Sequence, residues 1–174
     1  MSWRPLSHVA DDEFESLIHD VSPDLLSYLS RWTQPVDDAA DVLAETLLTL
    51  WRRHADLPPT RDRARAWAFG IARLQLANHR RGTLRRRALA ARLSQQLAGY
   101  DPYLTHDDPS MEQIHTALAD LPEDDQELIT LVNWDGFTIN DAAAVMGLPA
   151  STARSRYARA KARLTHALES QQRP

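Results

Sequence analysis

The sequence predicts an all-α protein of two small helical domains joined by a flexible linker, the second containing a helix-turn-helix. Apolar residues recur at the i, i+3, i+4 spacing of amphipathic helices, no convincing alternating strand occurs, and the chain has only 5 glycines in 174 residues. Residues 94–110 hold two prolines and a glycine without a sustained apolar period, which is typical of a linker. The domains are therefore expected at residues 1–93 and 111–174.

Two apolar helix faces open the first domain, and prolines set their limits. The first face consists of Phe14, Leu17, Ile18 and Val21, and the second of Leu25, Leu26, Leu29 and Trp32. Proline lacks the N–H group that a helix interior needs, so Pro23 is expected to interrupt the helix and Pro35 to close it. This part of the chain is thus predicted as two consecutive short helices.

Two further helices complete the first domain. A third helix opens at Asp37 and Asp38, where the helix dipole favours acidic residues. Its expected buried stripe is Val42, Leu43, Leu47, Leu50 and Trp51. A fourth helix is expected to begin near Arg63, with an inward stripe of Trp67, Ile71, Leu74 and Ala77. Trp67 also suits base stacking, but its position on this stripe favours a core role.

The second domain begins with a short helix that carries Ile114, Leu118 and Leu121. A longer helix then starts after Pro122, with three acidic residues in its first turn. Both features agree with the preferences of helix N-termini, so this part of the chain is predicted as a helical pair.

A helix-turn-helix is predicted next. The segment "TINDAAAVMG" opens with a T-x-x-D cap, buries Ala142, Ala143 and Met146, and ends at Gly147, which is expected to adopt a left-handed conformation. A last helix begins after Pro149. Its expected inward stripe is Ala153, Tyr157, Ala160, Leu164 and Leu168. Two helices joined through a glycine turn are typical of a DNA-binding motif.

Charge is divided into alternating blocks along the chain. Residues 1–57 carry a formal charge of -7 and residues 99–140 carry -10, whereas residues 58–98 carry +9 and residues 141–174 carry +4, within a net charge of -4. DNA affinity depends on local neutralisation of phosphates, so the two basic blocks indicate nucleic-acid binding despite the acidic balance. All the basic residues except Lys161 are arginines, whose forked group suits phosphates and guanine edges.

The first basic block concentrates five arginines in "RRGTLRRR", residues 80–87. A cation near a helix C-terminus gains only about 0.3–1 kcal/mol from the helix dipole, and like charges repel, so folding alone gives little reason for this cluster. The arginines of this helix are instead predicted to follow a nucleic-acid backbone. They are Arg73, Arg80, Arg81, Arg85, Arg86 and Arg87.

The last helix carries polar residues on its outward face. They are Thr152, Ser155, Arg156 and Arg159, with Arg154 beside them and Arg163 further along. Their position near the helix N-terminus allows the helix to enter a major groove, where arginine donates to guanine and the hydroxyls meet phosphates or bases. A solvated amphipathic face is the ordinary alternative, and the preceding helix and glycine turn favour DNA recognition over it.

Several classes of function are disfavoured by what the sequence lacks. It has no cysteine, and none of its seven histidines forms an H-x-x-x-H pair or a cluster with acids at ligand spacing, so no metal site or cofactor is expected. No phosphate-binding glycine loop, nucleophile elbow or carboxylate pair in a plausible cleft indicates an enzyme. No apolar run approaches the ~20 residues of a membrane span, and the N-terminus lacks the order of a secretory signal. A cytoplasmic protein without membrane insertion is therefore expected.

Three stretches together resemble an extracytoplasmic-function (ECF) sigma factor of the sigma-70 family. They are "DAADVLAETLLTLWRR", "RAWAFGIARLQLANHRR" and "ALADLPEDDQELITLVNWDGFTINDAAAVMGLPASTARSRYARAKARL", and their order and spacing match as well. The resemblance implies an alternative sigma factor, a bacterial subunit that binds core RNA polymerase and directs promoter recognition in transcription initiation. The first domain then corresponds to region 2 and the second to region 4.

The resemblance implies two surfaces for the polymerase. The helix that opens at residue 37 would dock on the clamp helices of the beta-prime subunit, through Asp38, Asp41, Glu45, Leu48 and Thr49. The acidic helix of the second domain would face the beta flap. The resemblance further implies an anti-sigma factor that covers both surfaces, and a nucleoid-associated location in the cytoplasm.

The resemblance also assigns the two promoter elements. The loop of residues 57–63 would hold a flipped base of the -10 element through Thr60, Arg61, Asp62 and Arg63, with the arginine-rich helix gripping the DNA beside it. The -35 element would be read by Arg154, Ser155 and Arg159 on the last helix.

The sequence departs from the family pattern at five positions. Ala40 and Ala44 stand where Glu and Gln are usual, Leu74 and Asn78 where Asn and Asp are common, and Ser151 where Gly is usual. The first four fall on the helices that the resemblance assigns to clamp docking and -10 recognition.

A second hypothesis remains open from the sequence: a helix-turn-helix regulator that binds DNA without polymerase and uses its N-terminal helices for dimerisation or ligand sensing. The two hypotheses differ in the role of residues 36–55. Run-off transcription with purified core enzyme separates them.

Overall fold

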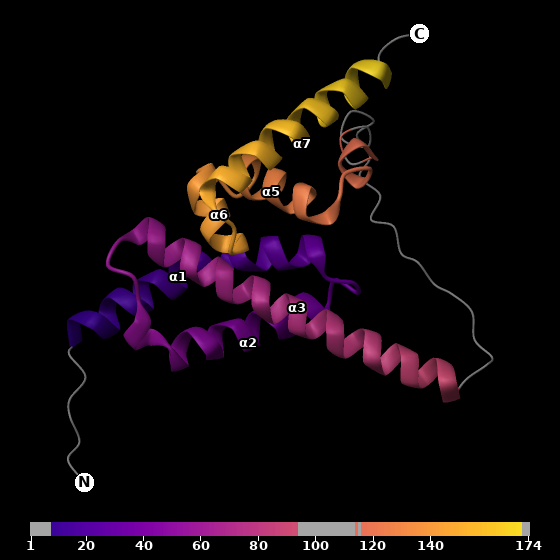
Figure 1. Cartoon of the computed structure of the whole chain (residues 1–174). Helices are drawn as coiled ribbons and strands as arrows, with labels where there is room; N and C mark the ends of the chain where they lie inside the picture. The colour runs from indigo at the N-terminus through magenta and orange to yellow at the C-terminus, as the bar shows by residue number, and fades with distance from the viewer. Residues whose placement is uncertain (1–7, 94–113, 115, 172–174) are drawn as a thin grey trace. The chain divides into compact units, whose positions relative to one another are not determined.

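The computed structural model describes residues 8–93, 114 and 116–171, and every regular element in these ranges is a helix (Figure 1). The helices are α1 (His8–Trp32), α2 (Asp38–Arg52), η1 (His54–Asp56), α3 (Arg61–Leu93), α5 (Glu123–Asn133), α6 (Ile139–Met146) and α7 (Ala150–Gln171). The chain divides into two compact units, the first around α1, α2 and most of α3, and the second around α5 and α7. The predicted all-α fold with two helical domains is confirmed. The predicted linker, residues 94–110, lies outside the described residues, so the domain boundaries stay a prediction.

The helix α1 is continuous, and the predicted interruption at Pro23 is wrong. The buried side of α1, which includes Val21, Leu25 and Leu29, runs unbroken past the proline, whose own side chain is exposed. Proline removes one backbone hydrogen bond, and its exposure places that loss on the solvent side of the helix. The burial of large apolar residues on both sides of the proline outweighs that loss.

The helix α2 packs against α1 with a different buried stripe from the predicted one. Its buried residues are Ala39, Val42, Thr46 and Leu50, while Leu43 and Leu47 are half-buried. Thr46 tolerates full burial because its hydroxyl donates to the Val42 carbonyl, 2.7 Å away. Trp51, expected in the core, is 61% exposed, and its ring meets the buried Phe14 edge to face at a centroid distance of 5.8 Å.

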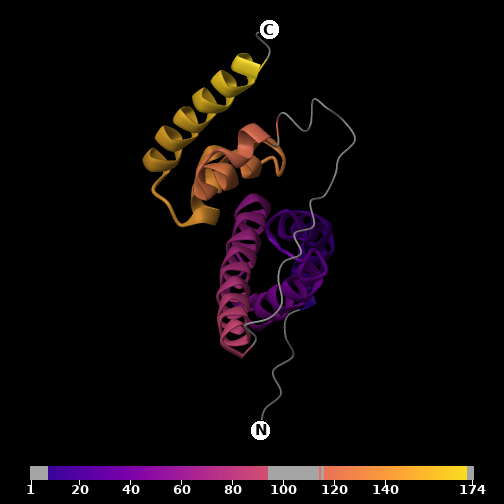
Figure 2. The same ribbon diagram turned by 90° about the vertical axis from the view of Figure 1, so that its right-hand side faces the viewer.

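The long helix α3 lies beside α1 and α2 in the first unit (Figure 2). It begins slightly before the predicted position and continues to Leu93, so the arginines of residues 80–87 lie within it and not at its end. Its buried ridge is Ala64, Ala68, Ala72 and Leu76, with Phe69 fully buried 5.4 Å from the ring of Tyr28. Of the predicted stripe, Ile71 is buried and Trp67 and Ala77 are half-buried, whereas Leu74, also expected in the core, is 62% exposed.

The second unit is organised around the contact between α5 and α7. Helical residues 116–119 precede α5, as the sequence predicted. The core consists of Leu118, Leu121, Ile129 and Ala160, with Ile114, Tyr157 and Leu164 packed against it. The predicted inward stripe of α7 is confirmed at its two fully buried alanines, Ala153 and Ala160, which let the helices approach closely.

Candidate nucleic-acid interface

A tight turn of defined hydrogen bonding leads from α6 to α7. The hydroxyl oxygen of Thr138 accepts the N–H of Asp141 at 3.1 Å, which caps α6. Gly147 ends α6 with a φ of 67°. The N–H groups of Gly147 and Leu148 donate to the carbonyls of Ala144 and Ala143, at 3.2 and 2.8 Å. This is the Schellman pattern, so both predicted cap signals are confirmed, and α7 starts two residues after the turn.

The solvent side of α7 carries most of the residues predicted to read DNA. Arg154, Ser155, Arg159 and Arg163 are exposed, and Thr152 is half-buried. Arg154 donates to the side-chain oxygen of Asn140 at 3.0 Å, which ties the first turn of α7 to α6. The Ser155 hydroxyl donates to the carbonyl of Thr152 at 3.0 Å. The N-terminal end of α7 is therefore held in place by the motif itself.

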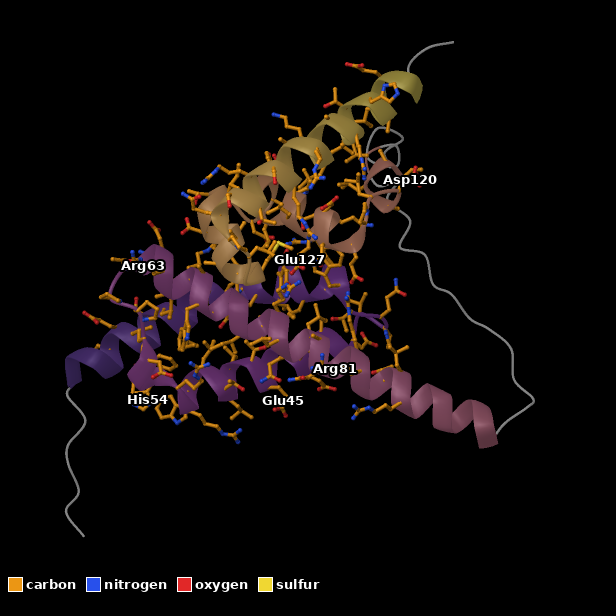
Figure 3. All side chains as sticks on the ribbon, viewed as in Figure 1. Glu45, His54, Arg63, Arg81, Asp120 and Glu127 are labelled. Atoms are coloured by element: carbon orange, nitrogen blue, oxygen red, sulfur yellow. The ribbon has the colours of Figure 1, made fainter. Side chains whose placement is uncertain are left out.

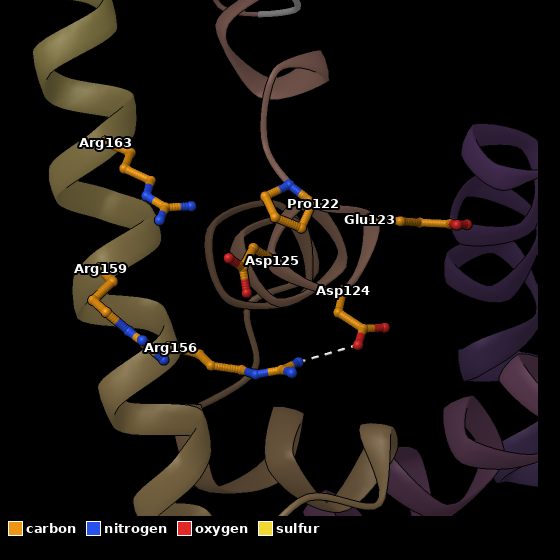
Figure 4. Close-up of a pocket in the computed structure, with 7 residues that line it drawn as sticks. All are labelled: Pro122, Glu123, Asp124, Asp125, Arg156, Arg159 and Arg163. Carbon is orange, nitrogen blue, oxygen red and sulfur yellow. Dashed lines mark hydrogen bonds and ion pairs between the residues drawn. The ribbon is translucent and has the colours of Figure 1, made fainter.

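Arg156 is half-buried on α7 and points toward the start of α5 (Figure 4). Its Nη1 donates to Oδ2 of Asp124 at 3.1 Å. Arg156, Arg159 and Arg163 line a concave pocket of about 400 Å³. The other lining residues are Pro122, Glu123, Asp124 and Asp125. Three of the arginines predicted to contact the -35 element thus border carboxylates of α5.

The segment predicted to hold a base spans the end of a loop and the first turn of α3. Thr60 precedes α3, and its carbonyl accepts the N–H of Ala64 at 2.8 Å. The side chains of Arg61, Asp62 and Arg63 are exposed in the first turn of the helix. Arg63 is labelled in Figure 3. The segment therefore has a regular backbone with polar groups open to solvent.

Two aspartates of α1 that the sequence did not single out, Asp20 and Asp24, form ion pairs with this segment. Arg61 donates to Asp20 at 2.7 Å, and Arg65, one turn later, donates to Asp24 at 3.0 Å. Both ion pairs join residues 41 positions apart in the chain. The two aspartates are four positions apart on α1 and the two arginines four positions apart on α3, so each set shares one side of its helix.

The arginines predicted along α3 have different surroundings. Arg80 donates from Nη2 and Nε to the carbonyl of Trp32 at the end of α1, at 2.8 and 3.3 Å. Arg73 is half-buried, whereas Arg81 and Arg85 are exposed. Arg81 also donates to the side chain of Asn78. Within the cluster, Arg80 therefore joins α3 to α1, whereas Arg81 and Arg85 are exposed to solvent.

The last two arginines of the cluster, Arg86 and Arg87, belong to α3, but their side chains lie outside the described residues. Their predicted contact with DNA stays a prediction, as do all the predicted site roles.

One side of α2 is exposed and carries acidic and apolar residues. Asp41 and Glu45 are exposed there, and Leu48 is 48% exposed (Figure 3 labels Glu45). The neighbouring Trp51 adds an apolar ring that the sequence analysis placed in the core. This side combines the charge and the apolar area that suit a basic protein partner.

The two remaining residues predicted on this side connect α2 to α3. The carboxylate of Asp38 lies 3.0 Å from Nε2 of His79. The hydroxyl of Thr49 accepts from Nε2 of Gln75 at 2.8 Å and donates to the carbonyl of Glu45 at the same distance. Within the described part of the chain, Asp38 and Thr49 therefore contribute to helix packing.

Neither a metal centre nor a membrane segment is found in the described ranges. No group of three histidine, aspartate or glutamate side chains there is placed to hold a metal ion. None of the helices described is long and apolar enough to span a bilayer.

Comparison with known families gives a match for each unit. The model for "Sigma-70 region 2" matches residues 17–87, and the model for "Sigma-70, region 4" matches residues 111–164. The first covers the helices that carry the arginine cluster and the acidic side of α2. The second covers the helix-turn-helix.

Two curated proteins illustrate the relation in sequence. The "Probable RNA polymerase sigma-C factor" of Mycobacterium bovis is 32% identical over 150 residues, which is 84% of this chain and 78% of that protein. The "ECF RNA polymerase sigma factor EcfG" of Rhodopseudomonas palustris is 30% identical over 150 residues, covering 82% and 78%.

Solved structures show the same likeness. The sigma factor RpoE, in its complex with the anti-sigma factor NepR from Bartonella quintana, aligns with a TM-score of 0.68 at 25% identity, over 90% of this chain and 97% of that one. CnrH, in its complex with the cytosolic domain of CnrY, aligns with a TM-score of 0.62 at 25% identity, over 92% and 90%.

Proposed function

This chain is a member of the extracytoplasmic-function group of the sigma-70 family, and from this membership we propose how its surfaces divide between promoter DNA and RNA polymerase. It is an alternative sigma factor that directs promoter recognition. Sigma factors act as initiation factors without an enzymatic step of their own, so the chain is proposed to have no catalytic residues. Its place of action is proposed to be the cytoplasm, at the nucleoid.

The helix α7 reads the -35 element in this proposal. The observation that supports it most is the Schellman turn, which presents the exposed Arg154, Ser155 and Arg159 from the start of α7. A helix so presented enters the major groove with its N-terminal residues at the base edges. Arg159 then donates to a guanine, while Arg154 and Ser155 contact bases or phosphates.

The -10 element is assigned to the first unit. The first turn of α3 offers the exposed Arg61 and Arg63 beside a flipped base, and Arg61 also forms an ion pair with Asp20. Arg81 and Arg85, further along α3, are proposed to follow the backbone of the melted strand. Arg80 is proposed to stabilise the fold and not to bind DNA, because two of its N–H groups already donate to the Trp32 carbonyl.

The acidic side of α2 is proposed as the docking surface for the polymerase clamp helices. Asp41 and Glu45 provide charge and Leu48 provides apolar area, all accessible in the first unit. Opposite charge accelerates the encounter of two proteins and fixes their orientation. In the second unit, the acidic start of α5 is proposed to face the beta flap.

An anti-sigma factor is a further proposed partner. The support comes from the solved complexes, in which RpoE binds NepR and CnrH binds the cytosolic domain of CnrY. A partner that covers the polymerase-facing surfaces would compete with core enzyme for this chain. Competition between the two in a pull-down assay tests that role once the partner has been isolated by its association with the chain.

Run-off transcription with purified core polymerase tests the proposed function. Templates come from mapping transcript start sites after overexpression of the chain, because the aligned upstream DNA contains both promoter elements. We expect promoter-specific transcripts only when core enzyme and this chain are both present. Absence of such transcripts, together with tight operator binding by the isolated chain, would favour a polymerase-independent regulator instead.

A further inference from the structure

The pocket beside α7 is lined by arginines of α7 and by acidic residues at the start of α5. Figure 4 shows Asp124 paired with Arg156, and the Glu123 side chain pointing away from α7. Arg156, Arg159 and Arg163 share one side of α7 because they recur every three or four positions. Glu123, Asp124 and Asp125 form the first turn of α5. The two sets of lining residues therefore carry equal and opposite formal charge.

Stability of the fold alone does not account for this arrangement. The side chains of Arg156 and Asp124 are 32% and 55% exposed, so water screens their attraction and the pair adds little to the free energy of unfolding. The dipole of α5 favours acids in its first turn but requires no arginine opposite them. The position of the pair on the proposed DNA-reading helix is the feature that needs a functional reason.

Carboxylates and phosphates compete for the same group on arginine. Both accept hydrogen bonds from the planar guanidinium fork, so the Nη1 donor that Arg156 gives to Asp124 is withdrawn from a phosphate. A DNA strand along this side of α7 would also approach the carboxylate of Asp125. Like charges at short range oppose that approach.

We propose that Asp124, together with Asp125, competes with DNA phosphates for the arginines of α7 and thereby lowers the affinity of this chain for DNA of every sequence. The inference rests on the proposed role of α7 in -35 recognition. This lower affinity leaves the discrimination between bases unchanged and reduces the occupancy of the many non-specific DNA sites in a genome. Asp124 acts through Arg156, because it accepts a hydrogen bond from the guanidinium group that would otherwise bind a phosphate.

The test is fluorescence anisotropy of a labelled duplex of random sequence, titrated with the full-length chain at several salt concentrations. Asp124→Asn is expected to bind about two- to fivefold more tightly at low salt, because it removes an exposed ion pair. Its plot of log affinity against log salt is expected to steepen by about one, because one more arginine becomes available to a phosphate. Asp124→Glu keeps the charge and is expected to behave as wild type.

Two further variants make the result specific to the pocket. Asp125→Asn removes another charge from the acidic residues that line the pocket and is expected to tighten binding as well, which keeps the test decisive if circular dichroism shows that Asp124→Asn is unfolded. Asp120→Asn removes the same charge from an exposed residue outside the pocket (Figure 3) and is expected to leave the salt slope unchanged.

The inference is overturned if Asp124→Asn and Asp125→Asn bind no more tightly than wild type. It is overturned equally if Asp120→Asn has the same effect, because net charge then explains the change. A wild-type chain that neither binds DNA nor supports run-off transcription contradicts the proposed function itself. A wild-type chain that does both, with unaltered Asp124→Asn affinity, contradicts this inference alone.

Discussion

Arg80 of α3 donates two N–H groups to the main-chain carbonyl of Trp32, the last residue of α1, at 2.8 and 3.3 Å. Its guanidinium also lies over the Trp32 ring, 5.9 Å from the centroid. The last carbonyls of a helix have no partner within that helix, so Arg80 caps α1 and joins it to α3. Replacing this residue should affect folding more than DNA binding.

The variant Arg80→Ala is expected to lower the free energy of unfolding by about 1–3 kcal/mol, because a half-buried carbonyl loses a charged donor. Urea unfolding followed by circular dichroism measures the change. Arg85→Ala, an exposed change on the same helix, serves as control and is expected to alter stability by less than about 0.5 kcal/mol. An Arg80→Ala protein as stable as wild type would show that the cap is dispensable.

Gly147 has a left-handed backbone conformation that alanine disfavours, so Gly147→Ala is expected to lower the stability of the protein by about 1–2 kcal/mol. The cause is the φ of 67° and not a clash, since an added Cβ would meet no atom within 4 Å. Gly82→Ala is the matched control, because Gly82 lies inside α3, where alanine is expected to stabilise by about 0.5–1 kcal/mol. Thermal unfolding of both variants measures the two changes in stability. If both variants were stabilised, or both destabilised, the left-handed conformation assigned to Gly147 would be contradicted.

The variant Arg159→Ala is expected to lose about 1–3 kcal/mol of binding free energy at the preferred base of the -35 element, with relaxed discrimination there. The measurement is binding of the reconstituted holoenzyme to promoters substituted singly across that element. Lys161→Ala, an exposed change on another side of α7, should keep the discrimination of wild type. Unchanged discrimination in Arg159→Ala would remove α7 as the reading helix.

A contact with the DNA backbone has a different signature from a base contact. Arg86→Ala is expected to weaken binding by a similar factor on all sequences and to flatten the salt slope by about one, because one fewer counterion is released. Salt titrations on two unrelated duplexes measure both properties. A loss confined to one duplex would indicate base reading by this residue instead.

The acidic side of α2 should determine association with core polymerase. The double variant Asp41→Lys, Glu45→Lys reverses exposed charge and is expected to weaken core binding by at least about tenfold, since like charges across an interface cost several kcal/mol. Glu15→Lys on α1 makes a single reversal at another exposed position as control. Core binding is measured by competition with a labelled wild-type chain, and equal affinities would exclude α2 as the docking surface.

Local signals in the sequence were reliable guides to local structure. Thr138, Asp141 and Gly147 predicted the ends of α6, and the structure contains both caps. Such signals depend on residues within a few positions of one another, so no knowledge of the tertiary structure is needed to interpret them. The family resemblance was predictable for the same reason, because it rests on motifs that are contiguous in the chain.

Predictions of helix orientation were less accurate. Trp51 and Leu74 were placed in the core because they are large and apolar, and both are mostly exposed. Thr46 is polar, which disfavours a core position in the sequence, yet it is buried because its hydroxyl is satisfied within α2. Pro23 predicts a break in the sequence, although packing on both sides of it keeps α1 continuous. In each case the neighbouring helices decided the outcome.

The sequence by itself determined the class of this protein: helical segments, their caps, the helix-turn-helix and the alternation of charge all depend on residues close together in the chain. The tertiary structure alone decided the partners of the individual charges. Arg80 meets a carbonyl 48 positions earlier, Arg61 a carboxylate 41 positions earlier, and Arg156 one 32 positions earlier. The physical reason is the short range of these interactions. A hydrogen bond extends only about 3 Å, so it forms only after packing has brought distant segments of the chain together.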